Sequence, residues 1–194
     1  ADYRKMIDDL FAEGKTTGKD HSESMLDYTK MNIHRMNRLD KTIELSESIL
    51  EKLKNVQCPV NWLLLTEAWC GDASQNVPIL AKMASASPNV NLRLMLRDEN
   101  LDIMDQYLTN GGRAIPKLII LDGGFNEIAT WGPRPSTVQE MVMENKRTGG
   151  MPYSEFGKVV QKWYAKDKGK SLQQEMMAII GQMECFLDER LNNS

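Results

Sequence analysis

The run Val60-Asn61-Trp62-Leu63-Leu64-Leu65-Thr66 constrains the fold more than any other segment of the 194-residue chain. It has the length of a strand and is almost continuously apolar, which is typical of a strand that is buried on both faces. A strand of this kind needs neighbouring strands in a sheet and helices packed over both faces of that sheet.

Strand and helix patterns alternate after this run. The expected elements are a helix over about Gly71–Ala86, a strand over 91–96, a helix over Leu101–Leu108, a strand over 117–121, a strand over 126–131 and a helix from Ser136 to about Arg147. The turn Asp122-Gly123-Gly124 is so tight that the last two strands must be antiparallel. This order predicts an α/β fold, a mixed sheet with helices on both faces and right-handed crossovers.

Helical patterns extend the chain on both sides of this core. We expect residues 1–55 to be an N-terminal helical extension, residues 56–148 the core, and residues 149–194 a C-terminal helical extension, packed together as a single domain. In the N-terminal extension Ser22 can cap a helix. The apolar residues of that helix form a loose stripe: Met25, Leu26, Met31, Ile33 and Met36. Farther along, Ser136 and Gln139 have the spacing of a capping box.

One cysteine stands where the first strand gives way to a helix. In Trp69-Cys70-Gly71-Asp72-Ala73 the Cys70 thiol is expected at the helix N-terminus, against unpaired backbone N–H groups and the positive end of the helix dipole. That setting favours the thiolate, which is the nucleophilic form of cysteine. The carboxylate of Asp72 acts in the opposite direction, because a nearby negative charge disfavours a thiolate.

Further features stand in a fixed order along the chain. They are Trp69-Cys70-Gly71, the helix proline Pro78, Ile115-Pro116-Lys117 before the third strand, Asp122-Gly123-Gly124 in the hairpin turn, and Trp131-Gly132 at the end of the last strand. Together they make residues 58–147 resemble the thioredoxin superfamily, most closely thioredoxin-like proteins with a Trp-Cys-Gly-Asp site. The resemblance implies a thioredoxin-like fold in which Cys70 is the catalytic residue and its active-site neighbours are Trp69, Gly71, Asp72 and Ala73.

The resemblance also implies how a substrate would be held. It predicts a cis peptide bond before Pro116, and cis bonds are almost confined to proline. Ile115 would then offer its backbone N–H and C=O to an extended substrate, as in β-augmentation. Two arginines are candidates for binding an anionic substrate group such as a glutathione carboxylate: Arg113, just before this loop, and Arg134. For the segment that contains Arg134, the favoured interpretation is a rigid exit from the last strand.

The sequence departs from the thioredoxin pattern at three positions. Ala73 stands where a dithiol site has its second cysteine, Asp72 replaces the usual proline, and Leu64 occupies the position of a buried acid. Glu67 lies close in sequence and is a candidate to replace that acid. The alternative is that Glu67 is a strand-end carboxylate in water, and the sequence leaves both interpretations open.

The other cysteines and the histidines add little to the site. Cys58 precedes the strand that Cys70 follows, and at ~3.3 Å per residue the strand separates them by roughly 20 Å, well beyond the limit of about 7 Å for a disulfide. Cys185 lies on the last helix, where a structural role is favoured over a resolving one. His21 and His34 lack the spacing of metal ligands, so we expect neither a metal nor another cofactor.

Composition limits the partners and the location. A net charge of −3 offers no electrostatic reason for binding nucleic acid or an anionic membrane, and the longest apolar runs have strand length, too short for a membrane span. Three scattered cysteines, and an N-terminus without the apolar core of a secretory signal, favour a cytoplasmic location. The sequence does not determine the oligomeric state.

Three interpretations of function remain. The first is a monothiol thiol-disulfide oxidoreductase, in which an accessible Cys70 with a lowered pKa forms a mixed disulfide with a protein or with glutathione and is released by an external thiol. The second is a non-catalytic thioredoxin-fold module that binds a peptide or acts as an adaptor. The third is a two-cysteine enzyme in which the cysteine at position 73 has been replaced by alanine.

Overall fold

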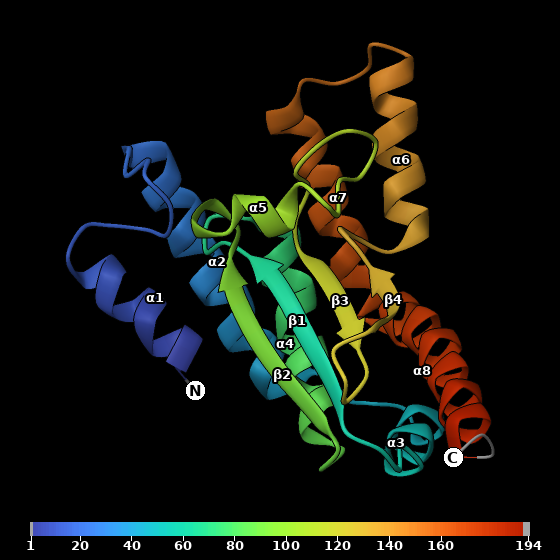
Figure 1. The fold of residues 1–194 in the computed structure, drawn as a ribbon. Helices are drawn as coiled ribbons and strands as arrows, with labels where there is room; N and C mark the ends of the chain where they lie inside the picture. The colour runs from blue at the N-terminus through green and yellow to red at the C-terminus, as the bar shows by residue number, and fades with distance from the viewer. Residues whose placement is uncertain (1, 192–194) are drawn as a thin grey trace.

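A four-stranded mixed sheet forms the centre of the protein (Figure 1). The computed structural model describes the backbone of residues 2–191, and the side chains of these residues except 153, 182 and 184–191. The strands are β1 (Val60–Thr66), β2 (Val90–Leu96), β3 (Lys117–Leu121) and β4 (Glu127–Trp131), in the order β2-β1-β3-β4. β1 is parallel to β2 and antiparallel to β3, and β4 is antiparallel to β3. The predicted mixed sheet is thus confirmed.

Helices cover the two faces of this sheet unequally. The helices are α1 (Asp2–Ala12), α2 (Glu23–Thr42), α3 (Glu47–Lys54), α4 (Gly71–Ser85), α5 (Leu101–Met104), α6 (Ser136–Arg147), α7 (Tyr153–Asp167) and α8 (Lys170–Leu191), with a 3₁₀ turn η1 (Arg97–Glu99). Side chains of α2, α3, α4 and α8 share one core cluster with the first face, whereas the second face packs mainly against the short α5. The fold is therefore thioredoxin-like, with helical additions at both ends.

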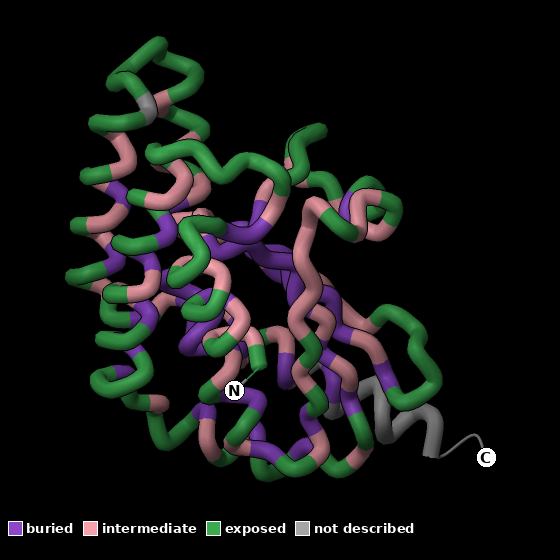
Figure 2. Tube along the Cα trace, turned by 90° about the vertical axis from the view of Figure 1, so that its left-hand side faces the viewer, coloured by how far each residue is buried: buried purple, intermediate pink, exposed green. Residues whose placement is uncertain are grey.

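The apolar run that predicted a buried strand is β1, and its alternating side chains reach both cores. Trp62 and Leu64 belong to the larger cluster beneath α4, whereas Leu65 belongs to the smaller one beside Met104 of α5. Successive side chains of a strand point to opposite faces, so both faces of β1 must be apolar when both are covered. Figure 2 shows the buried positions concentrated in the interior, with exposed positions along the outer sides of the helices.

The predicted stripe of the N-terminal helix is confirmed in part: Met36 is buried, Met25, Leu26 and Ile33 are half-buried, and Met31 is exposed. The buried residues of α2 are Thr29, Asn32, Met36 and Leu39, whereas Met31 is 43% exposed. The polar members of this stripe are buried because they have partners: the hydroxyls of Thr29 and Thr16 lie 2.5 Å apart, and the Asn32 side-chain amide donates to the Ala68 carbonyl at 2.8 Å. Ser22 stands at the N-cap of α2, but its side chain makes no capping hydrogen bond.

Two further details of the helices differ from prediction. The helix expected over Leu101–Leu108 ends at Met104, because Gln106 and Tyr107 donate to carbonyls three residues back and tighten the last turn. The capping box is absent: Ser136 donates through both its N–H and its hydroxyl to Glu175 of α8, each at 2.7 Å. Gln139 instead accepts a hydrogen bond from Arg134. Tertiary partners thus replace the local cap.

α6 and α7 form a hairpin beyond the end of the sheet at which β1 and β2 finish (Figure 1). Val138 of α6 and Val160 and Tyr164 of α7 are the buried residues that hold the two helices together. The α6–α7 hairpin is therefore placed over the end of the sheet that carries the N-terminus of α4. Within residues 2–191, no helix combines the length and the apolar composition needed to cross a membrane.

Candidate functional site

The Cys70 sulfur lies between the start of α4 and the loop before β3. Cys70 is the N-cap of α4, and its Sγ accepts a hydrogen bond from the Ala73 N–H at 3.5 Å. The same sulfur donates its proton to the carbonyl oxygen of Ile115 at 3.2 Å. The peptide bond between Ile115 and Pro116 is cis. Two motifs that are 45 residues apart in sequence are thus in direct contact.

The predicted lowering of the Cys70 pKa is wrong. Cys70 is half-buried, and its pKa is raised from an ordinary 9.0 to about 12, first because its sulfur is withdrawn from water and second because of the Asp72 charge. The backbone N–H groups of Ala73 and Asp72 and the Arg134 charge lower the pKa, but by less. A charged sulfur loses more by leaving water than it gains from a few peptide dipoles. At neutral pH, Cys70 is therefore a thiol.

Asp72 is held by a buried hydrogen-bond network. Arg134 donates to Oδ2 of Asp72 from Nη2 at 2.6 Å and from Nε at 3.0 Å, and the side chains of Arg134 and Asp72 are only 15% and 12% exposed. The Tyr164 hydroxyl donates to the other carboxylate oxygen at 2.9 Å, and Asn76 donates to that hydroxyl. Arg134 does lie beside the Cys70 motif, and the anion it binds is Asp72.

Helix α7 supplies site residues that the sequence analysis missed. Besides Tyr164, its Gln161 donates to the Gly71 carbonyl at 3.4 Å and accepts from Gln75 of α4 at 2.7 Å. Tyr164 and Gln161 are about 90 residues from the motif, and their helical spacing gave no sign of a polar role. The buried Ala73 of the motif is 2% exposed and belongs to the core.

Two polar side chains from the N-terminal region fix the backbone just before the motif. The Ala68 N–H donates to Thr17 at 2.8 Å, and the Ala68 carbonyl accepts from Asn32 at 2.8 Å. Next to Ala68, the half-buried Trp69 lies under the guanidinium of Arg97, which is 4.8 Å from the ring centroid. Arg97 also donates to the Arg113 carbonyl, so it links Trp69 to the loop before β3.

Glu67 is not a strand-end carboxylate in water, because it is only 1% exposed. One of its oxygens accepts from the Asp98 N–H at 2.9 Å, and the other has no hydrogen-bond partner among the described residues. Burial raises the pKa of Glu67, against the opposing effects of Thr17 and the Asp98 N–H. No hydrogen bond joins its carboxylate to Cys70 in the described part of the chain, so its role as a replacement acid stays a prediction. Leu64 is completely buried.

The remaining candidates lie apart from the sulfur. Arg113 forms a paired contact with Asp105, from Nε at 2.6 Å and from Nη2 at 2.9 Å. Cys58 and Cys70 are both free thiols, and the side chain of Cys185 lies outside the described residues. Among the described residues, no group of three or more histidine, cysteine or acidic side chains could hold a metal ion.

The close approach of two loops explains the glycine in Trp131-Gly132. Gly132 has φ of +111°, and a Cβ there would overlap the carbonyl oxygen of Pro116. Only glycine lets the backbone pass the Pro116 loop at this distance. Gly132 therefore sets the relative position of Arg134, which follows it, and Ile115, which holds the thiol.

A pocket of about 700 Å³ opens beside the motif, between loop 109–114 and the α6–α7 hairpin. We call it the hairpin pocket; its lining includes Gly71, Asp72, Arg113, Arg134, Lys146 and Gly157. Gly71 and the lining residue Ala114 are the chain neighbours of Cys70 and Ile115, whose sulfur and carbonyl are hydrogen-bonded. The pocket is therefore adjacent to the thiol.

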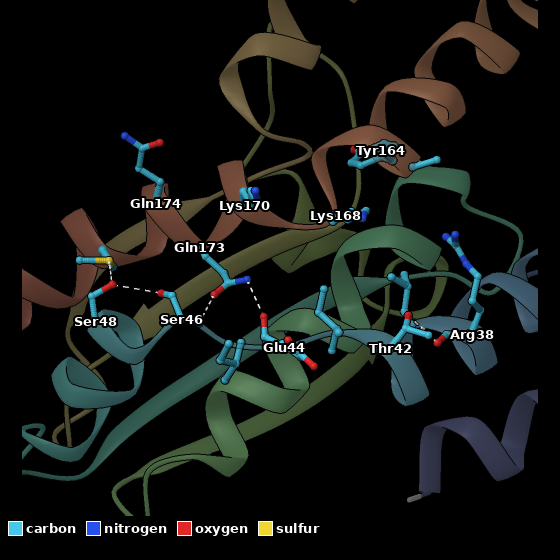
Figure 3. A pocket seen from close by; sticks show the side chains of 15 residues that line it. Arg38, Thr42, Glu44, Ser46, Ser48, Tyr164, Lys168, Lys170, Gln173 and Gln174 are labelled. Carbon is cyan, nitrogen blue, oxygen red and sulfur yellow. Dashed lines mark hydrogen bonds between the residues drawn. The ribbon is translucent and has the colours of Figure 1, made fainter.

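A second cavity of about 820 Å³ lies between the end of α2, the start of α3 and the junction of α7 and α8 (Figure 3). Gln173 spans one side of it, accepting from the Ser46 N–H at 2.8 Å and donating to the Glu44 carbonyl at 3.0 Å. Tyr164 also contributes to its lining. Because the Tyr164 hydroxyl contacts Asp72, this one residue connects the cavity wall to the Cys70 site.

Comparison with known proteins agrees with this arrangement. The crystal structure of a Pseudomonas aeruginosa protein of unknown function has 20% sequence identity and a TM-score of 0.61, over 89% of this chain and 95% of that one. The crystal structure of an HIV epitope scaffold has 19% identity and a TM-score of 0.58, over 90% and 96% of the two chains. At these identities the two structures show a shared fold alone. No curated protein matches the chain.

A family model supplies the relationship that these structures do not. The model described as thioredoxin matches residues 18–147, which make up most of the chain. The match includes α2 and α3, which the sequence analysis had left outside the resembling core, and it ends with α6. Asn32 of α2, which holds the backbone before Cys70, thus lies within the matched region. The chain belongs to the thioredoxin family.

Proposed function

We propose that the protein is a monothiol thiol-exchange protein, in which Cys70 forms a mixed disulfide with the sulfur of a protein or of glutathione. The observation that carries this proposal is the position of the sulfur. It lies at the N-terminus of α4, within hydrogen-bond distance of the Ile115 carbonyl and beside the cis peptide that precedes Pro116. Membership of the thioredoxin family is consistent with a reactive sulfur at this position.

The proposed step exchanges one sulfur–sulfur bond for another. Cys70 loses its proton, and its sulfur attacks one sulfur of the partner disulfide. A bond forms between these two atoms, the partner's own sulfur–sulfur bond breaks, and the leaving sulfur takes up a proton. Cys70 is thereby oxidised to a mixed disulfide, and the leaving sulfur is reduced to a thiol. An external thiol reverses the step by the same chemistry.

Groups around the sulfur would act on its two protonation states in opposite ways. The Ile115 carbonyl accepts a hydrogen bond from the Cys70 thiol and so stabilises the neutral thiol at rest. The N–H groups of Ala73 and Asp72, together with the Arg134 charge, favour the anion that attacks. Asp72 opposes them, and Arg134 and Tyr164 hold Asp72 in place. The reactivity of Cys70 would thus depend on this network.

The raised pKa predicts capture of a partner in place of rapid turnover. A thiol with a pKa of about 12 is seldom a thiolate at neutral pH, so attack is slow. The same thiol is a poor leaving group, so an external thiol removes the partner slowly as well. Ala73 supplies no neighbouring sulfur to displace the partner from within the motif. A mixed disulfide at Cys70 would therefore persist.

The test is to expose the protein to glutathione disulfide in a background that carries Cys58→Ser and Cys185→Ser. Intact-mass spectrometry should find one glutathione adduct, and Cys70→Ser should abolish it. Reduced glutathione should release this adduct more slowly from the folded protein than from the same adduct in urea, where burial is lost. The proposal would be falsified if Cys70 formed no adduct at pH 9 while the unfolded chain did.

The raised pKa also favours a second candidate, a module that binds a peptide without chemistry. In this function the half-buried thiol is a hydrogen-bond donor to Ile115, and the half-buried Trp69 next to it would make the contacts with the peptide. Cys70→Ser retains a donor of similar size and should leave binding of the partner unchanged. Loss of partner binding in Cys70→Ser would exclude this second candidate. Retained binding in Cys70→Ser, together with no glutathione adduct on the protein that keeps Cys70, would favour it.

A further inference from the structure

The hairpin pocket carries more positive than negative charge in its lining. Its cations are Arg113, Arg134 and Lys146, and its single carboxylate is Asp72. That carboxylate is already bound by Arg134 and by the hydroxyl of Tyr164. Among the described residues, neither the Lys146 ammonium nor Nη1 of Arg113 has a hydrogen-bond partner. The pocket therefore offers an anion one unpaired ammonium, that of Lys146, and one free N–H group of the Arg113 guanidinium, whose other nitrogens bind Asp105.

Part of the pocket lining is apolar. Val142, Phe156 and Val160 line it and also form the cluster that joins α6 to α7. Met143 and Met151 line the pocket as well and are 42% and 51% exposed. Methionine side chains adapt to ligands of different shape. A ligand with an apolar body would bury this surface and remove it from water.

Gly157 gives the pocket part of its room. It stands in the interior of α7, where glycine is a poor helix-forming residue. A Cβ at this position would meet no atom within 4 Å, so packing inside the protein does not require a glycine. Gly157 lines the pocket. The missing side chain thus leaves open space on the wall that faces a ligand.

We propose that the hairpin pocket binds a small carboxylate with an apolar body. The carboxylate would lie at Lys146 and Arg113, and the body would lie against Phe156 and Val160, beside Gly157. A volume of about 700 Å³ suits a ligand of this size. Because binding needs no reaction at the sulfur, this inference goes beyond the proposed mixed-disulfide chemistry and does not depend on it.

The test is to titrate the full-length protein with phenylbutyrate and, separately, with phenylbutanol, which has the same apolar body without the charge. Heteronuclear NMR gives both the affinity and the residues that shift. We expect the acid to bind up to about fivefold more tightly than the alcohol, with the largest shifts at Lys146 and Gly157. Lys146→Gln should weaken the binding of phenylbutyrate by about the same factor and leave the affinity for phenylbutanol unchanged. Lys158→Gln, a lysine on α7 outside the lining, is the matched control.

Gly157→Leu should fill the pocket and weaken both ligands by at least about tenfold. Gly157→Ala should weaken them less, and because alanine favours a helix, it keeps the test valid if the leucine variant fails to fold. Gly181→Ala in α8, outside the lining, is the control for replacing a helical glycine. Thermal unfolding of each variant separates a lost site from a lost fold.

Three results would overturn the inference: equal affinity for acid and alcohol, unchanged affinity in Gly157→Leu, or no binding of phenylbutyrate at its solubility limit. Cys70→Ser should bind phenylbutyrate as the wild type does. A loss of binding in Cys70→Ser would show that the pocket and the sulfur are a single site, which also contradicts the inference. In the protein that keeps Cys70, binding of phenylbutyrate without formation of a glutathione adduct would count against the mixed-disulfide proposal alone.

Discussion

Cys70 should react with a small neutral disulfide, such as dithiodipyridine, about 50-fold more slowly than an ordinary thiol at pH 8. The reason is the environment of its sulfur, which burial and the Asp72 charge make hard to ionise. The helix N-terminus alone would have predicted the opposite, a fast-reacting thiolate. The rate therefore measures which of these effects controls the site.

The magnitude follows from the pKa and from intrinsic nucleophilicity. A thiol with a pKa of about 12 in place of 9.0 holds about a thousandfold less thiolate at pH 8. The thiolate of a more basic thiol is also a better nucleophile, by about 20-fold for this difference if the Brønsted coefficient is about 0.4–0.5. The two factors act in opposite directions, and their ratio leaves a net slowing of about 50-fold.

Asp72→Asn removes the second cause of the raised pKa while keeping an oxygen that accepts from Arg134; its new amide N–H group would face the Tyr164 hydroxyl, which can accept a hydrogen bond. Removing the charge should raise the thiolate population about tenfold and, after the loss of nucleophilicity, the rate about threefold. Asp105→Asn is the matched control, because Asp105 is an exposed carboxylate paired with Arg113 and is not among the groups that shift Cys70. Its rate should equal that of the wild type.

Stopped-flow absorbance of the released thiopyridone gives these rates from pH 7 to 10, in a background without Cys58 and Cys185. The rate should still rise with pH at pH 10, because the folded thiol has not yet titrated. If Cys70 reacts as fast as a model thiol at pH 8, or if Asp72→Asn is no faster than Asp105→Asn, then burial and the Asp72 charge do not control the sulfur.

Further predictions concern stability. Gly132→Ala should lower the free energy of unfolding in urea by about 3 kcal/mol or more, because its Cβ would overlap the Pro116 carbonyl and φ is +111°; a loss below about 1 kcal/mol would contradict the close approach. Arg134→Met should lower the free energy of unfolding by about 2–4 kcal/mol, because it leaves Asp72 buried without its cation. Adding Asp72→Asn to this variant should recover part of that loss in a double-mutant cycle. From pH 8 to 10 the wild type should lose about 1.4 kcal/mol more stability than Cys70→Ser. The reason is that the thiol of the unfolded chain loses its proton near pH 9.0, whereas the thiol of the folded protein keeps it up to about pH 12. Parallel curves of unfolding free energy against pH for the two proteins would refute the raised pKa.

Local patterns predicted the sheet well because strand formation in this chain follows the hydrophobic run and the turn residues. β1 begins and ends where the apolar run does, and the antiparallel pairing of β3 with β4 follows from the tight Asp122-Gly123-Gly124 turn. The fixed order of Cys70, Pro116 and Gly132 also identified the centre of the site. These features depend on residues close in sequence, or on a family pattern that spans the core.

Predictions about polar residues in helices were less accurate. The buried stripe of α2 contains Thr29 and Asn32, which periodicity of apolar residues cannot identify. Ser136 and Gln139 have the spacing of a capping box. The Ser136 hydroxyl instead donates to Glu175, and the Gln139 side chain accepts from Arg134. Asn32 and Ser136 have partners 36 and 39 residues away in the sequence, and Gln139 bonds to Arg134 outside its own helix. A buried polar group goes where its partner is.

The sequence by itself determined the thioredoxin-like core, the position of the single thiol in it and the absence of a second cysteine at residue 73. Only the tertiary structure decided the protonation state of the Cys70 thiol. Burial is a property of the folded chain, and here it outweighs the helix N-terminus and raises the Cys70 pKa to about 12. Likewise, only folding brings Arg134 and Tyr164 onto Asp72 and closes the hairpin pocket beside it, because these contacts join segments about 60 and 90 residues apart.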